Sequence, residues 1–181
     1  MERFTAPAVQ KRLQGEQARI AKAMTATKAD NPKDQSSQLA ATEHLYLFLS
    51  SSMGEDALRR LLAGIAGLGG EQIVPVFAGL PHGLDDWPGN TRFFQQVLQE
   101  EPTCRDAATK TCERLQVALQ INPVLFRQYG ISAVPTLVYD NGSRAWSVQG
   151  EAQLAVLLER MNTAANSPSL GSLVASLRGG Q

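Results

Sequence analysis

Apolar and polar positions along the chain predict a domain of mixed helices and strands. Residues 44–50 are dense in apolar and aromatic side chains, which favours a buried strand. Apolar residues recur at helical spacing over residues 57–68, before Gly69-Gly70, and residues 72–78 predict a second buried strand. A strand, a helix of about 14 residues and a strand imply two parallel strands joined by a right-handed crossover.

The last third of the chain predicts a helix followed by a hairpin. Residues 123–129 indicate a short helix that Gly130 ends, and residues 134–140 indicate a strand. Asn141-Gly142 is a strong signal for a two-residue hairpin turn, so residues 144–149 should return antiparallel to that strand.

The remaining parts of the central region have mixed signals. Residues 79–120 contain several chain-breaking prolines and glycines, Pro88-Gly89 among them, and we expect helices only near residues 91–99 and 107–119. Residues 151–161 predict an amphipathic helix.

Polar segments flank this region at both ends. Residues 1–40 predict a polar N-terminal extension and linker, and residues 8–28 within it favour a loosely docked or partner-dependent helix over a core helix. Residues 163–181 predict a linker and a short helix, whose apolar face consists of Leu170, Leu173, Val174 and Leu177. That face can pack back on the domain or dock on another protein, and the sequence leaves both open.

Composition and charge exclude several classes of protein. The 181 residues are 43% apolar and carry 17 Lys and Arg against 17 Asp and Glu, which suits one globular domain with an appendage. A nucleic-acid-binding protein needs a surplus of Lys and Arg to displace counterions, and this chain has none. No apolar run is longer than that of residues 45–49, whereas a transmembrane helix needs about 20 such residues.

The residues alone leave the cellular compartment open. The N-terminal residues lack the apolar region of a secretory signal, which fits a cytosolic protein or a mature form whose signal has been removed. Cys104 and Cys112 fit a disulfide in an oxidising compartment or two free thiols in the cytosol.

The order of the predicted elements resembles that of a thioredoxin-like domain. The strongest signal is Val134-Pro135-Thr136 at the start of a strand. In thioredoxin-like proteins such a step carries a cis peptide bond facing the active-site turn, and proline is the residue at which a cis bond costs little. We therefore expect a cis-Pro135 in an α/β, thioredoxin-like fold of β-α-β, a helical insertion and α-β-β-α, with helical extensions at both ends.

Two longer blocks carry a more specific resemblance. Residues 45–53, Leu-Tyr-Leu-Phe-Leu-Ser-Ser-Ser-Met, and residues 119–135, with Gln-Ile-Asn-Pro, Leu-Phe, Tyr-Gly-Ile and Val-Pro, are similar to the TrbC family of F-type conjugative transfer systems. Members of that family are pilus assembly proteins. Asn122 departs from the family's usual Asp but still suits a helix cap before Pro123. The resemblance covers residues 43–162, which we interpret as the thioredoxin-like domain.

The usual redox motif of the superfamily falls where this chain has no cysteine. A thioredoxin-type oxidoreductase needs Cys-x-x-Cys at the start of the first helix, where the helix N-terminus lowers the pKa of the attacking thiol. Here the four positions hold Met53-Gly54-Glu55-Asp56, and Met53 has no ionisable proton. We therefore expect no thiol–disulfide exchange at this site and no enzymatic activity.

Cys104 and Cys112 lie away from that motif. On an unbroken helix their spacing would place them about 12 Å apart, whereas a disulfide needs Cα atoms within about 7 Å. Either they are unbridged on one helix, or a turn between them lets them pair. The periplasmic location that the resemblance implies favours a disulfide between them. We expect this disulfide to stabilise the fold rather than to act as a redox centre.

Other candidate chemistry is sparse. His44 and His82 lie in no motif, and the serines of residues 50–52 are better explained as a cap of the following helix than as a nucleophile. Asp85-Asp86 and Glu100-Glu101 are typical of solvated loops. The sequence has no phosphate-binding glycine loop and no metal-ligand cluster, so we expect neither a cofactor nor a metal.

The resemblance implies a non-catalytic periplasmic protein that acts in conjugative pilus assembly and type IV secretion through contacts with a TraW-type protein. The predicted partner site consists of Ser52, Met53, Gly54, Val134 and Pro135. Thioredoxin-like proteins bind extended chains beside the cis-proline, which is why we place the site there. Two alternatives stay open: a periplasmic disulfide isomerase or chaperone that uses the two cysteines, and a structural subunit of the secretion channel.

Overall fold

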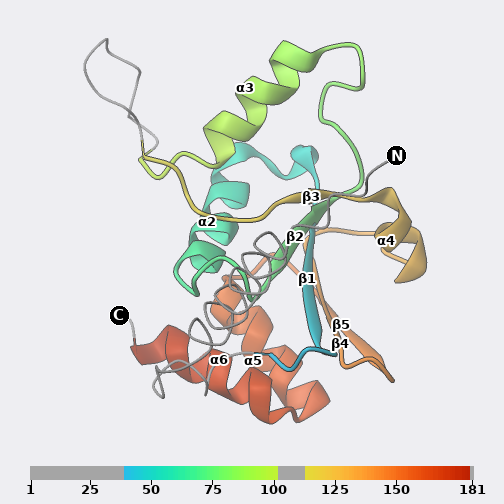
Figure 1. Ribbon diagram of the computed structural model, residues 1–181, viewed down its shortest axis with the longest axis vertical. Coiled ribbons are helices and arrows are strands. Elements are labelled where there is room, and N and C mark those ends of the chain that lie inside the picture. The colour runs from blue at the N-terminus through green and yellow to red at the C-terminus, as the bar shows by residue number, and fades with distance from the viewer. Residues whose placement is uncertain (1–38, 102–112, 180–181) are drawn as a thin grey trace, which may run out of the picture. The chain divides into compact units, whose positions relative to one another are not determined.

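The structure is a computed structural model that describes residues 39–101 and 113–179 (Figure 1). The described elements are β1 (His44–Leu49), the 3-10 helix η1 (Ser51–Met53), α2 (Glu55–Ala66), β2 (Val74–Phe77), α3 (Trp87–Val97), β3 (Gln120–Ile121), α4 (Pro123–Gln128), β4 (Thr136–Asp140), β5 (Ala145–Gln149), α5 (Leu154–Ala165) and α6 (Pro168–Gly179). The predictions for residues 1–38 and for Cys104 and Cys112 lie outside the described residues.

Five strands form one mixed sheet in the order β3-β2-β1-β4-β5. Strand β1 runs parallel to β2, and β2 runs parallel to β3. Strand β4 runs antiparallel to both β1 and β5. This is the element order expected of a thioredoxin-like α/β fold, which is confirmed, with the two-residue β3 as an additional edge strand that the sequence did not predict.

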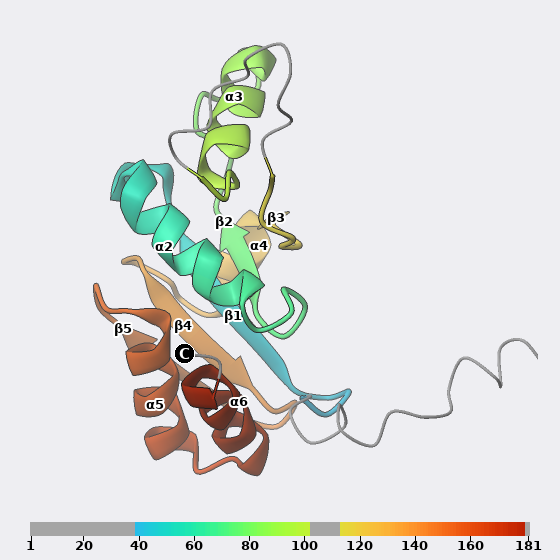
Figure 2. The same ribbon diagram turned by 90° about the vertical axis from the view of Figure 1, so that its left-hand side faces the viewer.

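The alternation of side chains along β1 divides the core into two parts. Leu45, Leu47 and Leu49 join the larger cluster, together with buried side chains of α2, α3, α5 and α6. Phe48 faces the other way and joins a smaller cluster under α4. In Figures 1 and 2, α2, α5 and α6 accordingly lie on one side of the strands and α4 on the other.

Helix α4 is held on its face of the sheet by aromatic packing and one partly buried polar pair. The rings of Phe48 and Phe126 pack edge to face with centroids 4.9 Å apart. The Tyr129 hydroxyl donates to Oδ2 of Asp140 at 2.7 Å. Burial, and then Asp140, raise the pKa of Tyr129 well above its ordinary value. Tyr129 therefore stays a neutral hydrogen-bond donor that joins the end of α4 to the end of β4.

Helix α3 begins earlier than the sequence predicted. Instead of starting near residue 91 it begins at Trp87, because the Oδ1 atom of Asp86 accepts a hydrogen bond from the Gly89 amide at 2.9 Å. Pro88 lies in the first turn, where its missing N–H has no helical partner to lose. A Cβ at Gly89 would lie 2.1 Å from Oδ2 of Asp86, so glycine leaves room for this cap. The residues interpreted as breakers start the helix.

The helix predicted over residues 107–119 is wrong in the part that the structure describes. Residues 113–119 are not helical and lead directly into β3. Leu115, Val117 and Leu119 pack partly against the core, whereas the residues between them are exposed. The apolar residues thus recur with the period of two that is typical of extended chain.

The β4–β5 hairpin forms as predicted, but its turn lies one residue further along the chain. The Asn141 amide donates to the Arg144 carbonyl at 3.1 Å, so the central residues are Gly142 and Ser143. Gly142 has a φ of +85°, which glycine adopts without strain. Asn141 contributes its side chain instead, because its Oδ1 atom accepts from the Ser143 amide at 3.0 Å.

The apolar face of α6 packs back on the domain. Leu170 and Leu173 are buried, and Val174 and Leu177 pack against the same core cluster. Helix α5 extends to Ala165, so the linker expected here shrinks to two residues, with Asn166 in the left-handed conformation at the end of α5. None of the helices in residues 39–101 and 113–179 is long and apolar enough to cross a membrane.

Candidate functional site

Met53 lies where β1 passes into α2. The Ser50 side chain accepts a hydrogen bond from the Ser52 amide at 3.3 Å and thereby caps the 3-10 helix that Met53 ends. Gly54 then precedes α2 without a side-chain cap. The serines therefore cap the short turn, and not α2 as predicted, while two acidic side chains in the first turn of α2 complement the helix dipole.

Pro135 precedes β4, and the Val134–Pro135 peptide bond is cis, the conformation that the resemblance led us to expect. The Thr136 hydroxyl donates to the Ala133 carbonyl at 2.7 Å, and the Gly150 amide donates to the Pro135 carbonyl at 3.2 Å. These bonds fix the chain on both sides of the proline. We find no hydrogen bond between the backbone N–H or C=O of Val134 and any residue that the structure describes.

Met53 and Pro135 line the same hollow, which has a volume of about 610 Å³. Helix α2 contributes one side through Ala57, Arg60, Leu61 and Gly64. Residues 151–155, at the start of α5, contribute the other side, and Leu177 of α6 completes the lining. The hollow therefore joins the turn after β1, the start of β4 and three helices.

The structure brings together two of the five predicted partner-site residues. Met53 and Pro135 line the hollow, whereas Ser52, Gly54 and Val134 are absent from its lining. Ser52 and Gly54 are exposed in the turn beside it, and Val134 packs with the cluster under α4. The site is thus centred further along α2 than the sequence indicated.

Some of the lining residues that we did not predict show a recognisable pattern in the sequence. Ala57, Arg60, Leu61 and Gly64 recur at helical spacing, so the α2 side of the hollow forms one stripe of that helix. Residues 151–155 had no such signal, because they reach the hollow only through the packing of α5 against the sheet.

The lining of the hollow suits binding. Most of its side chains are apolar, and Met53 supplies a flexible thioether that adapts to different shapes. Arg60 and Glu151 are exposed at the hollow and offer one charge of each sign. No lining residue is a cysteine or a histidine, and within the described part of the chain no three His, Cys, Asp or Glu side chains are grouped as metal ligands.

Comparison with known protein families matches residues 47–163 to the type-F conjugative transfer system pilin assembly proteins, the TrbC F-type family. The chain belongs to this family. Its role accordingly lies in the assembly of F-type conjugative pili. The matched segment includes the β1–α2 turn, Pro135 and residues 151–155, which together form most of the hollow of this family member.

Among solved structures, the chain is similar to MTB dsbF, determined in its mixed oxidized and reduced forms. The two share 12% sequence identity and a TM-score of 0.35, over 77% of this chain and 81% of that one. No curated protein matches the sequence. The thioredoxin-like fold of this TrbC-family chain therefore rests on its element order and sheet topology.

Proposed function

We propose that the protein is a non-catalytic binding module of the conjugative periplasm, which holds an extended segment of a TraW-type transfer protein in the hollow beside Pro135. The observation that carries the proposal is that Met53 and Pro135 line one hollow. Met53 occupies the first position of the superfamily's redox motif, and a thioether has no ionisable proton with which to become a nucleophile. At the position where a thioredoxin has its reactive cysteine, this chain would therefore offer an apolar contact to a bound segment.

The backbone beside the hollow supports an extended partner. Val134 offers an amide and a carbonyl that no described residue uses, immediately before the buried Pro135. An extended chain pairs with such groups as a strand adds to a sheet, and it places alternate side chains into a neighbouring hollow. Met53 and Leu177 would then contact apolar side chains of the partner segment.

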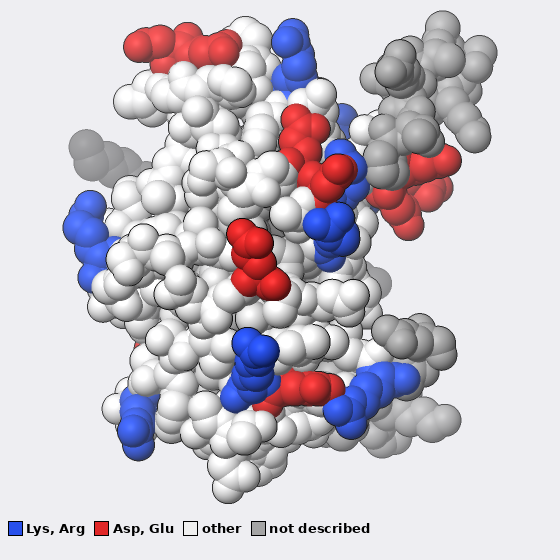
Figure 3. Space-filling model, turned by 180° about the vertical axis from the view of Figure 1, so that it is seen from behind, with Lys and Arg blue, Asp and Glu red and all other residues white. Residues whose placement is uncertain are grey.

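Charge supports a protein partner. In the view from behind, the basic side chains of the described residues, all of them arginines, are interspersed with Asp and Glu rather than gathered in one patch (Figure 3). A surface of this kind lacks the continuous basic stripe that follows a phosphate backbone. Arg60 and Glu151 instead suit a segment that carries charges of both signs.

Two alanines of α2 provide a matched test. Ala57 lines the hollow, whereas Ala63 is exposed on the same helix outside the lining. We expect Ala57→Arg to weaken binding of a purified TraW-type protein at least about tenfold in isothermal titration calorimetry, which corresponds to about 1.4 kcal/mol, because the new side chain fills the hollow. Ala63→Arg should bind like the wild type. Equal affinity of all three proteins would overturn the proposed site.

An insulin-reduction assay separates this proposal from the enzyme alternative. With dithiothreitol as reductant, the full-length protein should not accelerate insulin precipitation over the uncatalysed rate. Acceleration that disappears in Cys104→Ser would instead establish an oxidoreductase that uses the two cysteines.

A further inference from the structure

The loop between β2 and α3 presents two large apolar side chains to solvent. Leu84 is 86% exposed and Trp87 is 67% exposed, the highest values among the large apolar residues of the described segments. The two positions are three residues apart, at the point where the loop enters α3. Neither lines the hollow beside Pro135, so this surface is distinct from the proposed TraW-type site.

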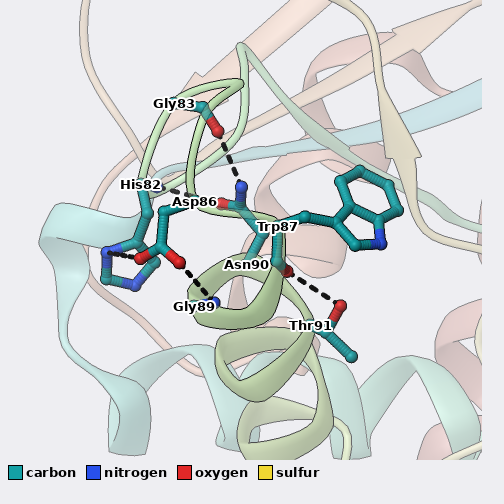
Figure 4. Close-up of polar contacts among 7 residues, drawn as sticks. All are labelled: His82, Gly83, Asp86, Trp87, Gly89, Asn90 and Thr91. Carbon is teal, nitrogen blue, oxygen red and sulfur yellow. Dashed lines mark hydrogen bonds and ion pairs between the residues drawn. The ribbon is translucent and has the colours of Figure 1, made fainter.

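A buried amide fixes the path of this loop. Asn90 is only 1% exposed, and its Oδ1 atom accepts from the His82 amide at 2.9 Å while its Nδ2 atom donates to the Gly83 carbonyl at 2.7 Å. Figure 4 shows these bonds on one side of the loop, with the Trp87 ring pointing away from them. The oxygen and the nitrogen of the Asn90 side chain therefore both hydrogen-bond to the loop backbone. Loss of either bond would leave a buried polar group unpaired and lower the stability of the loop.

Helix α3 in turn connects the loop to the core. Phe93 is 8% exposed and Val97 is fully buried. The Phe93 ring packs edge to face on the core residue Phe77, with centroids 6.4 Å apart. Leu84 and Trp87 are thus presented by a platform that is anchored at both ends, through β2 and through α3.

We propose that residues 82–87 form a second docking surface, which inserts Leu84 and Trp87 into an apolar pocket rimmed by Lys or Arg on a partner protein. Tryptophan is enriched among the residues that dominate binding energies at protein interfaces. A loop already fixed in its final shape loses little conformational entropy on binding. Burial of the exposed apolar side chains in a partner would contribute binding free energy. The two hydrogen bonds of Asn90 hold the loop in the conformation that presents these side chains to solvent.

The charge of the loop specifies the rim of the pocket. Asp85 and Asp86 lie between the two apolar anchors and are exposed, and residues 82–87 contain no Lys or Arg. Asp86 caps α3 and lies 4.0 Å from Nδ1 of His82, so a basic rim would pair chiefly with Asp85, and this pairing would weaken with added salt. The same carboxylates are repelled by anionic lipid, which favours a protein over a membrane surface as the partner.

The test is photo-crosslinking in conjugating cells, with the full chain carrying Leu84→benzoylphenylalanine. The matched control carries the same replacement at Val156, an exposed apolar residue of α5. We expect a discrete crosslink to one protein at position 84 and none at position 156. The crosslinked peptide, identified by mass spectrometry, should lie among apolar residues with Lys or Arg beside them.

The crosslinked protein, once purified, provides the quantitative readout. In the wild type its binding should blue-shift tryptophan emission, a shift that Trp87→Phe removes. In isothermal titration calorimetry its affinity should weaken with added sodium chloride and fall at least about tenfold in Leu84→Ser/Trp87→Ser. Ala57→Arg should leave binding to the crosslinked protein unchanged. The proposed TraW-type site and the proposed loop surface can therefore be disproved independently. Absence of a crosslink at position 84, equal crosslinking at position 156, or a blue shift produced by vesicles of phosphatidylethanolamine and phosphatidylglycerol would overturn the proposal.

Discussion

At the scale of single residues, the Tyr139 hydroxyl connects the two ends of the described domain. It donates to the carboxylate of Glu43, just before β1, and lies 3.0 Å from the Ser167 hydroxyl between α5 and α6. Burial alone would raise the pKa of Glu43. Hydrogen bonds from Tyr139, from the Ala40 amide and from the Ser169 and Ser167 side chains together outweigh burial and hold that pKa below its ordinary value of 4.5.

This lowered pKa predicts how stability depends on pH. A carboxylate whose pKa falls on folding stabilises the protein above its unfolded pKa, and the contribution is lost as the pH falls through the folded pKa. We expect Glu43→Gln to lower the free energy of unfolding by about 1 kcal/mol near pH 7, with the difference shrinking towards pH 3. Urea unfolding followed by circular dichroism at both pH values measures it.

The control for this prediction is Glu71→Gln, which removes an exposed carboxylate. It should change stability little at either pH. A difference between Glu43→Gln and the wild type that stays constant or grows at low pH would contradict the role assigned to Glu43.

At the scale of elements, the sequence specified best those whose signals are local. Helix α4 begins as predicted at Pro123, because the Oδ1 atom of Asn122 accepts from the Val124 amide at 3.1 Å. Strand β3 was missed because it forms only by pairing with β2. Residues 113–119 were misassigned as helix, although Leu115, Val117 and Leu119 alternate with exposed residues as in extended chain. A two-residue strand leaves no periodicity of its own to detect.

The residues of the candidate site likewise fall into those that the sequence could place and those that it could not. Met53 and Pro135 could be placed from the resemblance, because each lies at a fixed point of the element order. Residues 151–155 and Leu177 could not, since they approach the hollow only after α5 and α6 have packed. The resemblance thus located Met53 and Pro135, and tertiary packing brings the residues of α5 and α6 to the same hollow.

Helix α6 carries a prediction at this scale, because its packing on the domain makes it part of the folding unit. Leu173 is 1% exposed, so Leu173→Ala should lower the free energy of unfolding by about 2–5 kcal/mol in urea denaturation. Leu84→Ala makes the same chemical change at an exposed position and should alter stability by no more than about 0.5 kcal/mol. Similar small effects of both substitutions would mean that α6 is not docked in solution.

At the scale of the whole molecule, two surfaces with different chemistry belong to one domain. The hollow beside Pro135 is concave and carries one charge of each sign, whereas residues 82–87 project apolar side chains beside two carboxylates. A protein with one concave surface and one protruding apolar surface can bind two partners at the same time, and this requires no catalytic activity. That arrangement suits a member of a pilus assembly family, and it is the one expected if the protein acts by binding, as proposed above.

The most direct test of this account is mating frequency in a conjugating strain that lacks the chromosomal or plasmid copy and is complemented with variants of the full chain. Each variant is first shown to be folded by circular dichroism. We predict that Ala57→Arg, which fills the hollow, abolishes transfer, and that Cys104→Ser/Cys112→Ser supports transfer close to the wild type. Normal transfer with Ala57→Arg, together with loss of transfer in the folded cysteine variant, would contradict a binding module and establish a thiol-dependent activity.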